Sequence, residues 1–300
     1  MIYRCRKDRF TAEEYDQRSG TFWKMPPALS RADQTSQLAE YWRVGGKGVI
    51  SLLPLFGLTA NATFADCLNL SKEKAARLAG LSQSTVARSG PVLAELKLAN
   101  ERPVYYHGKK STQWSLGSAF PIALTGCDGY FYFSARTVYG GAWSQLTGVQ
   151  RALYLALGTR AKTFHDSDTL DSFLRYLVRP DTPLTDIKNA YHHNQSLGAG
   201  GVRLSVASYS ELAQMTGISK SGVKAAVAAL KHPDVWPGAP TADTLRFSPL
   251  GVLPSDGGSL IYLFRDHAEP WPWDVLNARP VPVAAAGYDD ALDDLIDLVD

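Results

Sequence analysis

Two neighbouring stretches in the first third of the chain place apolar residues at helical spacing. Residues 71–79 predict a short amphipathic helix, and residues 82–96 predict a second one. Gly80 suits the left-handed backbone that ends a helix, and the Ser82 hydroxyl can cap the next helix. Four apolar residues have the spacing that packs the two helices at a steep angle: Ala76, Leu78, Leu81 and Val86. The stretch therefore predicts a helix-turn-helix.

Gly90 and Pro91 fall inside the second helix of this pair. Pro91 cannot donate a backbone hydrogen bond to Ala87, so the helix either bends there or ends near Ser89. In the second case Pro91 would begin a new helix. We favour the bend, because residues 92–96 continue the same apolar face.

The next residues change from helical spacing to an alternation of period two. Residues 103–106 and 112–116 alternate as strands do, and they flank a basic hairpin tip at residues 107–110. A helix-turn-helix that is followed by such a β-hairpin is a winged helix.

The same pattern returns 137 residues later. Ala213–Val223 aligns without a gap to Ala76–Val86, and a glycine, an aliphatic residue, two serines and a valine coincide. Ser210 and Ser219 can cap the two helices of this second copy. Two matching copies in one chain are much stronger evidence than one, because single helix-turn-helix patterns arise by chance.

The second copy also ends in a predicted hairpin. Residues 244–248 and 259–264 are expected to be its strands, with the tip near residues 254–258. This tip contains Asp256 and no lysine, in contrast to the basic tip of the first hairpin.

Both copies are preceded by an aromatic strand and an apolar helix. Residues 22–27 predict the first strand, and residues 49–56 predict the first helix, which Pro54 should kink or shorten. Residues 130–133 and 144–162 predict the same two elements before the second copy. The repeat therefore extends upstream of the helix-turn-helix.

Two further helices are expected outside this repeat. Residues 33–44 predict one helix, which a Gly-Gly pair interrupts. Residues 170–178 predict another, inside an insertion at residues 163–203. The insertion is otherwise expected to be a loop, and its residues 181–201, which are rich in Pro, Asn, His and Gly, are expected to be mobile.

Together the patterns predict the α+β class and two tandem winged-helix domains. We call residues 21–125 the first module and residues 126–267 the second module. A basic arm at residues 1–20 precedes them, and a Pro- and Trp-rich linker with an acidic tail follows at residues 268–300.

Charge is unevenly distributed along the chain. The net charge is only +2, but residues 284–300 contain six Asp and no Lys or Arg, which leaves +8 on residues 1–283. Residues 71–116 contain eight basic and three acidic side chains, whereas residues 205–265 contain five and four. The first module is therefore the more attractive to phosphate groups.

The sequence lacks the patterns of an enzyme, a metal site or a cofactor site, so we expect none of these. Three cysteines without metal-like spacing favour a reduced, cytoplasmic protein. His192 and His193 lack partners at ligand spacing, and residues 45–48 lack the spacing of a phosphate-binding loop. The sequence has no signal-peptide core and no run of about 18 apolar residues, so we expect no membrane association.

The outward-facing polar residues are of the types that contact bases and phosphates. In the first module these candidate DNA-binding residues are Ser82, Gln83, Ser84, Thr85 and Arg88, with His107, Lys109 and Lys110 at the hairpin tip. In the second module they are Ser219, Lys220, Ser221 and Lys224. Double-stranded DNA is therefore the expected partner.

In this arrangement the chain resembles the plasmid replication initiators that are built from two winged helices. The resemblance is architectural, covers about residues 20–265, and is carried by Ala76–Val86 and Ala213–Val223 with their hairpins. It implies a protein that binds repeated DNA sites at a plasmid origin as a monomer and helps to open an adjacent AT-rich region. It also implies that host replication proteins are partners and that a homodimer represses the protein's own promoter.

Two other functions fit the same pattern. A transcriptional regulator with tandem winged helices would bind a promoter, and a winged-helix scaffold would bind protein instead of DNA. Repeats of ~20 bp beside the gene would favour the initiator, and a lone palindrome at a promoter would favour the regulator. The scaffold would show no salt-sensitive DNA binding.

Overall fold

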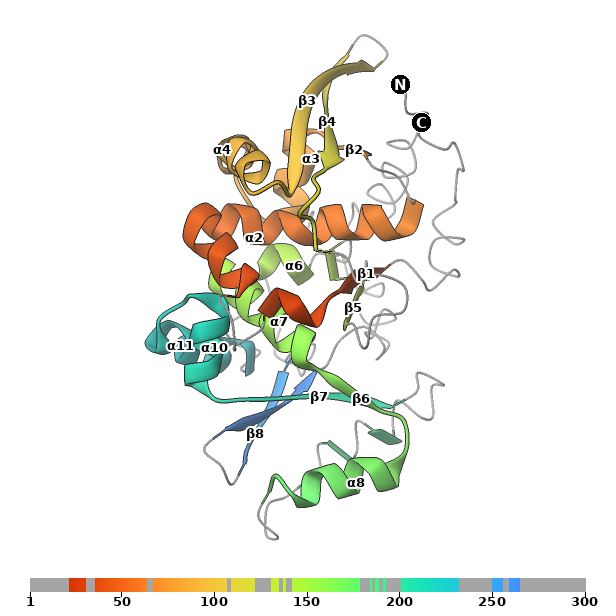
Figure 1. Cartoon of the computed structure of the whole chain (residues 1–300), viewed down its shortest axis with the longest axis vertical. Coiled ribbons are helices and arrows are strands. Elements are labelled where there is room, and N and C mark those ends of the chain that lie inside the picture. The colour runs from red at the N-terminus through yellow and green to blue at the C-terminus, as the bar shows by residue number, and fades with distance from the viewer. Residues whose placement is uncertain are drawn as a thin grey trace, which may run out of the picture.

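The computed structural model describes residues 22–30, 36–63, 67–106, 109–121, 131–134, 137–138, 142–178, 184, 187–188, 191–192, 201–231, 250–255 and 259–264. Within them, helices combine with three small antiparallel sheets, so the protein belongs to the α+β class, as expected (Figure 1). The predicted basic arm and the linker with its acidic tail lie outside the described residues.

The first module combines a long central helix, a helix pair and a three-stranded sheet. Its elements are β1 (Phe22–Met25), η1 (Pro27–Ser30), α2 (Gln37–Thr63), β2 (Cys67–Asn69), α3 (Lys72–Ala79), α4 (Gln83–Glu95), β3 (Ala99–Tyr106) and β4 (Lys109–Leu116). Strand β4 lies between β2 and β3. Strands β3 and β4 are longer than the sequence pattern predicted.

The second module has a four-stranded sheet and an additional helix, α8. Its elements are β5 (Phe131–Ser134), α6 (Ala142–Gln145), α7 (Gly148–Arg160), β6 (Lys162–Phe164), α8 (Ser167–Arg175), β7 (Val202–Ala207), α10 (Tyr209–Thr216), α11 (Lys220–Lys231), β8 (Leu250–Pro254) and β9 (Leu260–Phe264). The strand order is β6-β7-β9-β8.

The two modules repeat the same order of elements. Each has a central helix, a strand, a pair of helices and two more strands, and the second module has β6 and α8 in addition. In both sheets the last strand lies between the strand that precedes the helix pair and the strand that follows it. The shared sheet order is β2-β4-β3 in the first module and β7-β9-β8 in the second. The repeated pattern in the sequence therefore corresponds to a repeated topology.

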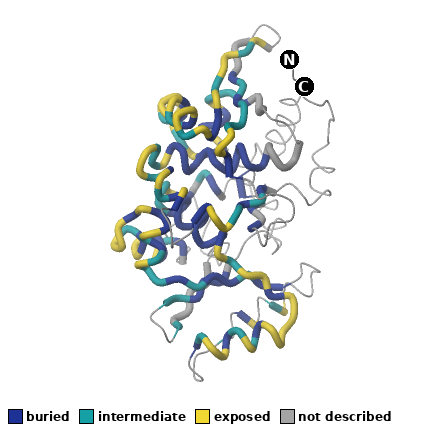
Figure 2. Tube along the Cα trace, viewed as in Figure 1, coloured by how far each residue is buried: buried dark blue, intermediate teal, exposed yellow. Residues whose placement is uncertain are grey.

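One hydrophobic core joins the two modules. Strands β1 and β5 pair with each other, with Trp23 opposite Phe133, and α2 packs along α7. The rings of Phe133 and Trp143 meet edge to face with centroids 5.2 Å apart, an arrangement that aromatic rings prefer. Buried residues follow both central helices through the middle of the molecule (Figure 2). The modules therefore share an interior.

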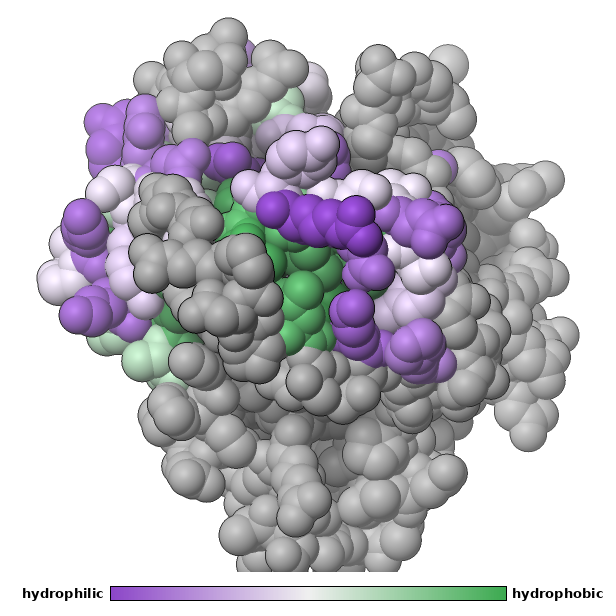
Figure 3. All heavy atoms as spheres, turned by 90° about the horizontal axis from the view of Figure 1, so that it is seen from below, coloured by the Kyte–Doolittle hydropathy of each residue, from purple (hydrophilic) through white to green (hydrophobic). Residues whose placement is uncertain are grey.

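A second, smaller core lies on the other face of the second module's sheet. Along β9, the side chain of Tyr262 belongs to the shared core, whereas Ile261 and Leu263 belong to the second core. Leu170 and Leu174 of α8 cover this face. The view from below shows an apolar area bordered by hydrophilic side chains (Figure 3). The predicted helix in the insertion is therefore present, but it begins and ends three residues earlier than residues 170–178. Ile187, in the stretch that was expected to be mobile, is also buried in this core.

The central helices differ from the sequence prediction at their breaks. The expected interruption is confirmed at Gly46, whose backbone (φ 55°, ψ −148°) is not helical, but α2 continues through Pro54 to Thr63. The single helix expected at residues 144–162 is instead split into α6 and α7. Thr147 causes this split, because its side chain and that of Gln150 form a capping box that starts α7.

The second module differs from the sequence prediction at the cap of α10 and at the first strand of its hairpin. Ser208, and not Ser210, caps α10, because the Glu211 side chain accepts a hydrogen bond from the Ser208 backbone N–H in return. In the second hairpin the strand beside β9 is β8, which is five residues long, whereas the predicted strand at residues 244–248 lies outside the described residues. Helix α4 continues through Pro91 to Glu95, so the helix does not end near Ser89 and no new helix begins at Pro91.

Candidate nucleic-acid interface

Local hydrogen bonds fix where α4 begins. Gly80 has the left-handed backbone (φ 58°, ψ 44°) that the sequence predicted, and it ends α3. The Ser82 hydroxyl accepts a hydrogen bond of 3.2 Å from the Thr85 backbone N–H, so Ser82 is the predicted cap. Val86 and Leu93 face the core, whereas Gln83 and Ser84 are exposed.

Arg88 lies back along the first turn of α4. Its Nε donates to the Ser84 carbonyl oxygen at 3.3 Å, and its Nη2 donates to the Thr85 hydroxyl at 3.5 Å. The Ser82 hydroxyl lies 2.9 Å from the hydroxyls of both Ser84 and Thr85. The first turn of α4 contains no acidic residue. A guanidinium and three hydroxyls therefore form one exposed, cationic group that suits a phosphate or a base edge.

The hairpin β3–β4 extends from the body beside α4 (Figure 1). Its register pairs Tyr105 with Lys110 and Tyr106 with Lys109. The Tyr105 side chain is 76% exposed, which is unusual for a large aromatic residue. His107 lies outside the described residues, and for Lys109 and Lys110 only the backbone is described.

Helix α11 has the same construction as α4. Gly217 ends α10 with a left-handed backbone (φ 69°, ψ 10°), and the Ser219 hydroxyl accepts a hydrogen bond of 3.2 Å from the Gly222 backbone N–H. The expected core residues Val223, Val227 and Leu230 are buried. The candidates on this helix are all exposed: Ser219, Lys220, Ser221 and Lys224.

The exposed surfaces of α4 and α11 correspond in the alignment of the two modules, but their cationic side chains stand at neighbouring positions and not at the same one. The gapless alignment of the modules equates Lys224 with Ala87 and Ala225 with Arg88, and all four residues are exposed. Figure 1 shows α4 and α11 on the same side of the molecule. The structure thus brings Ser82, Gln83, Ser84, Thr85 and Arg88 together on one helix and the second-module candidates together on the other.

Sequence reasoning missed two exposed residues of the first hairpin. Arg102 donates a hydrogen bond from Nε to the Gln113 side chain, and both residues lie on the outer face of the sheet. Tyr105 was treated only as part of a strand. The period-two alternation was a usable signal, because buried Trp114 faces inward and its neighbour Gln113 must then face outward.

Comparisons with protein-family models, with curated proteins and with solved structures found no match to this chain. Among the described helices, none is both long enough and apolar enough to cross a lipid bilayer.

Proposed function

We propose that this protein binds double-stranded DNA through two tandem winged-helix modules. The observation that carries the proposal is the matched pair α4 and α11. Each follows a left-handed glycine, begins at a capping serine and exposes hydroxyls and a cation without an acidic residue in its first turn. The second helix of a helix-turn-helix enters the major groove with such residues at its start.

We further propose that the protein acts as a plasmid-type replication initiator. The support is the resemblance described above, together with two DNA-reading helices in one chain that share one core. Two helices on one side of B-DNA should lie about one helical turn, or ~10 bp, apart. One chain should therefore protect roughly 20 bp without a second copy.

Selection of bound sites from random double-stranded DNA, followed by a search for them beside the gene, tests both proposals. Repeated sites of roughly 20 bp are expected for an initiator. A single palindrome at a promoter would point to a transcriptional regulator instead. Hydroxyl-radical footprinting should show that Gln83→Ala with Arg88→Ala shortens protection from one end and Lys220→Ala with Lys224→Ala from the other.

DNA-binding titrations at several salt concentrations test whether the protein binds DNA through the phosphate backbone. The logarithm of affinity should fall with the logarithm of salt concentration by about 0.9 for each neutralised phosphate. Failure to select any site, together with an affinity that does not change with salt, would refute DNA binding and favour a protein-binding scaffold. A footprint of one half-site per chain would refute the tandem arrangement.

A further inference from the structure

A buried arginine lies where the two modules meet. Arg151 of α7 is only 1% exposed, and all three of its side-chain nitrogens donate hydrogen bonds. Nε donates to the Trp143 carbonyl oxygen and Nη2 to the Ser144 carbonyl oxygen, each at 2.9 Å, whereas Nη1 donates to the Ser51 hydroxyl at 2.5 Å. Ser51 belongs to α2, so this guanidinium links the central helices of both modules.

Ser51 accepts a second hydrogen bond from the other module. The Trp143 Nε1 donates to the Ser51 carbonyl oxygen at 2.9 Å. Burial lowers the pKa of Arg151 to about 10, so it remains charged at neutral pH. A charged group that is buried against uncharged oxygens is costly unless its geometry is well satisfied. The three acceptors therefore give each nitrogen of the buried guanidinium a hydrogen-bond partner.

The turn before α4 rests on this arginine. A Cβ atom at Gly80 would overlap the Ser144 carbonyl oxygen and the Arg151 Nη2 atom. The backbone between α3 and α4 thus lies directly against the second module. We call Arg151, Ser51, Trp143, Ser144 and Gly80 the Arg151 junction.

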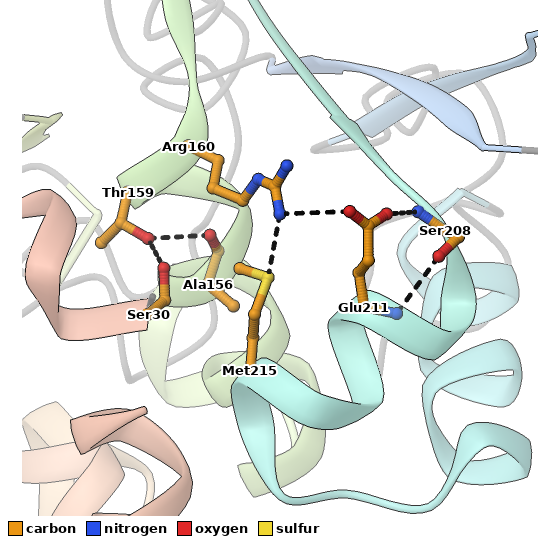
Figure 4. A network of polar contacts seen from close by, with 7 residues as sticks. All are labelled: Ser30, Ala156, Thr159, Arg160, Ser208, Glu211 and Met215. Carbon is orange, nitrogen blue, oxygen red and sulfur yellow. Dashed lines mark hydrogen bonds and ion pairs between the residues drawn. The ribbon is translucent and has the colours of Figure 1, made fainter. Parts of the chain in front are cut away.

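The turn before α11, in the second module, makes a looser contact with α2 of the first module. A Cβ atom at Gly217 would lie 3.2 Å from the Ala39 carbonyl oxygen of α2. The Ser36 hydroxyl donates to the Met215 carbonyl oxygen at 2.7 Å. Beside it, Ser30 and Thr159 share a hydrogen bond between the modules, whereas Arg160 contacts Glu211 and Met215 within the second module (Figure 4). Each turn is therefore supported by the other module.

We infer that Arg151 is a positioning residue that fixes the separation and rotation of α4 relative to α11, and thereby the spacing of the two DNA half-sites that one chain accepts. This inference rests on the proposed DNA binding. Each added base pair moves one half-site by about 3.4 Å and by roughly a tenth of a turn relative to the other. A rigid Arg151 junction makes the protein sensitive to such a change, and a loosened one makes it tolerant.

The test measures affinity for selected sites whose half-site spacing is changed in steps of one base pair. We expect the wild type to lose at least about tenfold in affinity for each step, and Arg151→Met to lose less than about threefold. Arg160→Met is the matched control, because it removes an arginine from the same helix whose partners lie within the second module. The control should keep the spacing dependence of the wild type.

A merely structural role would lower affinity equally at every spacing, and an unchanged spacing profile in Arg151→Met would overturn the inference. Ser51→Ala, which removes one acceptor, gives the same comparison if Arg151→Met does not fold. The distance between spin labels at Ala94→Cys and Ala228→Cys, without the three native cysteines, provides a second readout. Arg151→Met should broaden this distance distribution even without DNA. If no DNA binds, the proposed function fails, while an unbroadened distribution refutes the junction separately.

Discussion

The two modules share the order of three sheet strands, β2-β4-β3 and β7-β9-β8, but differ in the surfaces around them. In the first module, the hairpin β3–β4 has strands of eight residues, and its sheet has an outer face with exposed Arg102. In the second module, β8 and β9 have five residues each, and α8 covers the outer face of the sheet. With the same order of three strands, the outer face of the sheet therefore has an exposed cationic side chain in the first module and is covered by a helix in the second.

The cationic side chains on the exposed surfaces of α4 and α11 also differ. Helix α4 has a planar guanidinium that can contact a base edge or a phosphate with two hydrogen bonds, whereas the lysines of α11 act as point charges. Lys109 and Lys110 add to the first module, and residues 255–259 of the second hairpin contain no lysine. If the protein binds DNA as proposed, we expect the first module to contribute more contacts to base edges and the second module more contacts to the DNA backbone.

The largest expected effect is a loss of stability that distinguishes the roles of the two hydrophobic cores. Leu174→Ala removes a fully buried side chain of α8, and such truncations cost about 2–5 kcal/mol. Because Leu174 belongs only to the second core, DNA affinity measured on the folded protein should remain unchanged. Leu153→Ala in the shared core is the control and should reduce both stability and DNA affinity. Urea unfolding and DNA titration would measure the two effects, and a loss of affinity in Leu174→Ala would contradict the separation.

Arg88→Ala tests sequence reading by the first module. If the guanidinium contacts a guanine with two hydrogen bonds, its loss should cost about 1–3 kcal/mol and relax one base position. Binding of the selected site and of its single-base variants would measure this. Arg175→Ala, at an exposed position on α8, is the matched control and should have no effect. An equal loss on every sequence would identify Arg88 as a phosphate contact.

Lys224→Ala tests backbone contact by the second module. We expect a uniform loss of affinity and a salt dependence that is shallower by about 0.9, the value for one phosphate. Ala87→Lys introduces a lysine at the matching position of α4 and should make the salt dependence steeper. Titrations at several salt concentrations would decide between this prediction and a change limited to one base position, which would assign Lys224 to sequence reading.

The smallest expected effect concerns the caps of α3 and α10. The hydrogen bond from the Ser208 backbone N–H holds the pKa of Glu211 below its ordinary value of 4.5. The stability that this carboxylate contributes is therefore complete above pH 4.5 and is lost as the pH falls through its lowered pKa. Glu211→Gln should make stability fall less steeply in that acidic range.

Helix α3 provides the control for this measurement. Ser71 caps it without a carboxylate at the third helical position, which is Lys74. Glu73→Gln should therefore leave the acid dependence of stability nearly unchanged. Thermal unfolding between pH 3 and pH 6 would compare the two variants, and an equal response in both would refute the role of the capping box.

The elements nearest to α4 and α11 followed from the local sequence. Gly80, Ser82, Gly217 and Ser219 have the roles that their types and spacing predict. Helix caps and turns depend on hydrogen bonds to residues only a few positions away, so a short stretch of sequence contains most of the required information. The same reasoning failed at Ser210, because two serines near the helix start were both acceptable and the reciprocal bond from Glu211 selected Ser208.

Contacts between distant residues were decided only by the tertiary structure. The helical pattern placed residues 144–162 on one helix, but nothing near Arg151 in the sequence reveals that Ser51, 100 residues away, accepts its hydrogen bond. The pairing of β8 with β9 and the packing of α8 on the sheet likewise join residues that are far apart in the chain. Such contacts form because burying apolar surface and satisfying buried donors favour one arrangement of the whole chain, which local spacing does not encode.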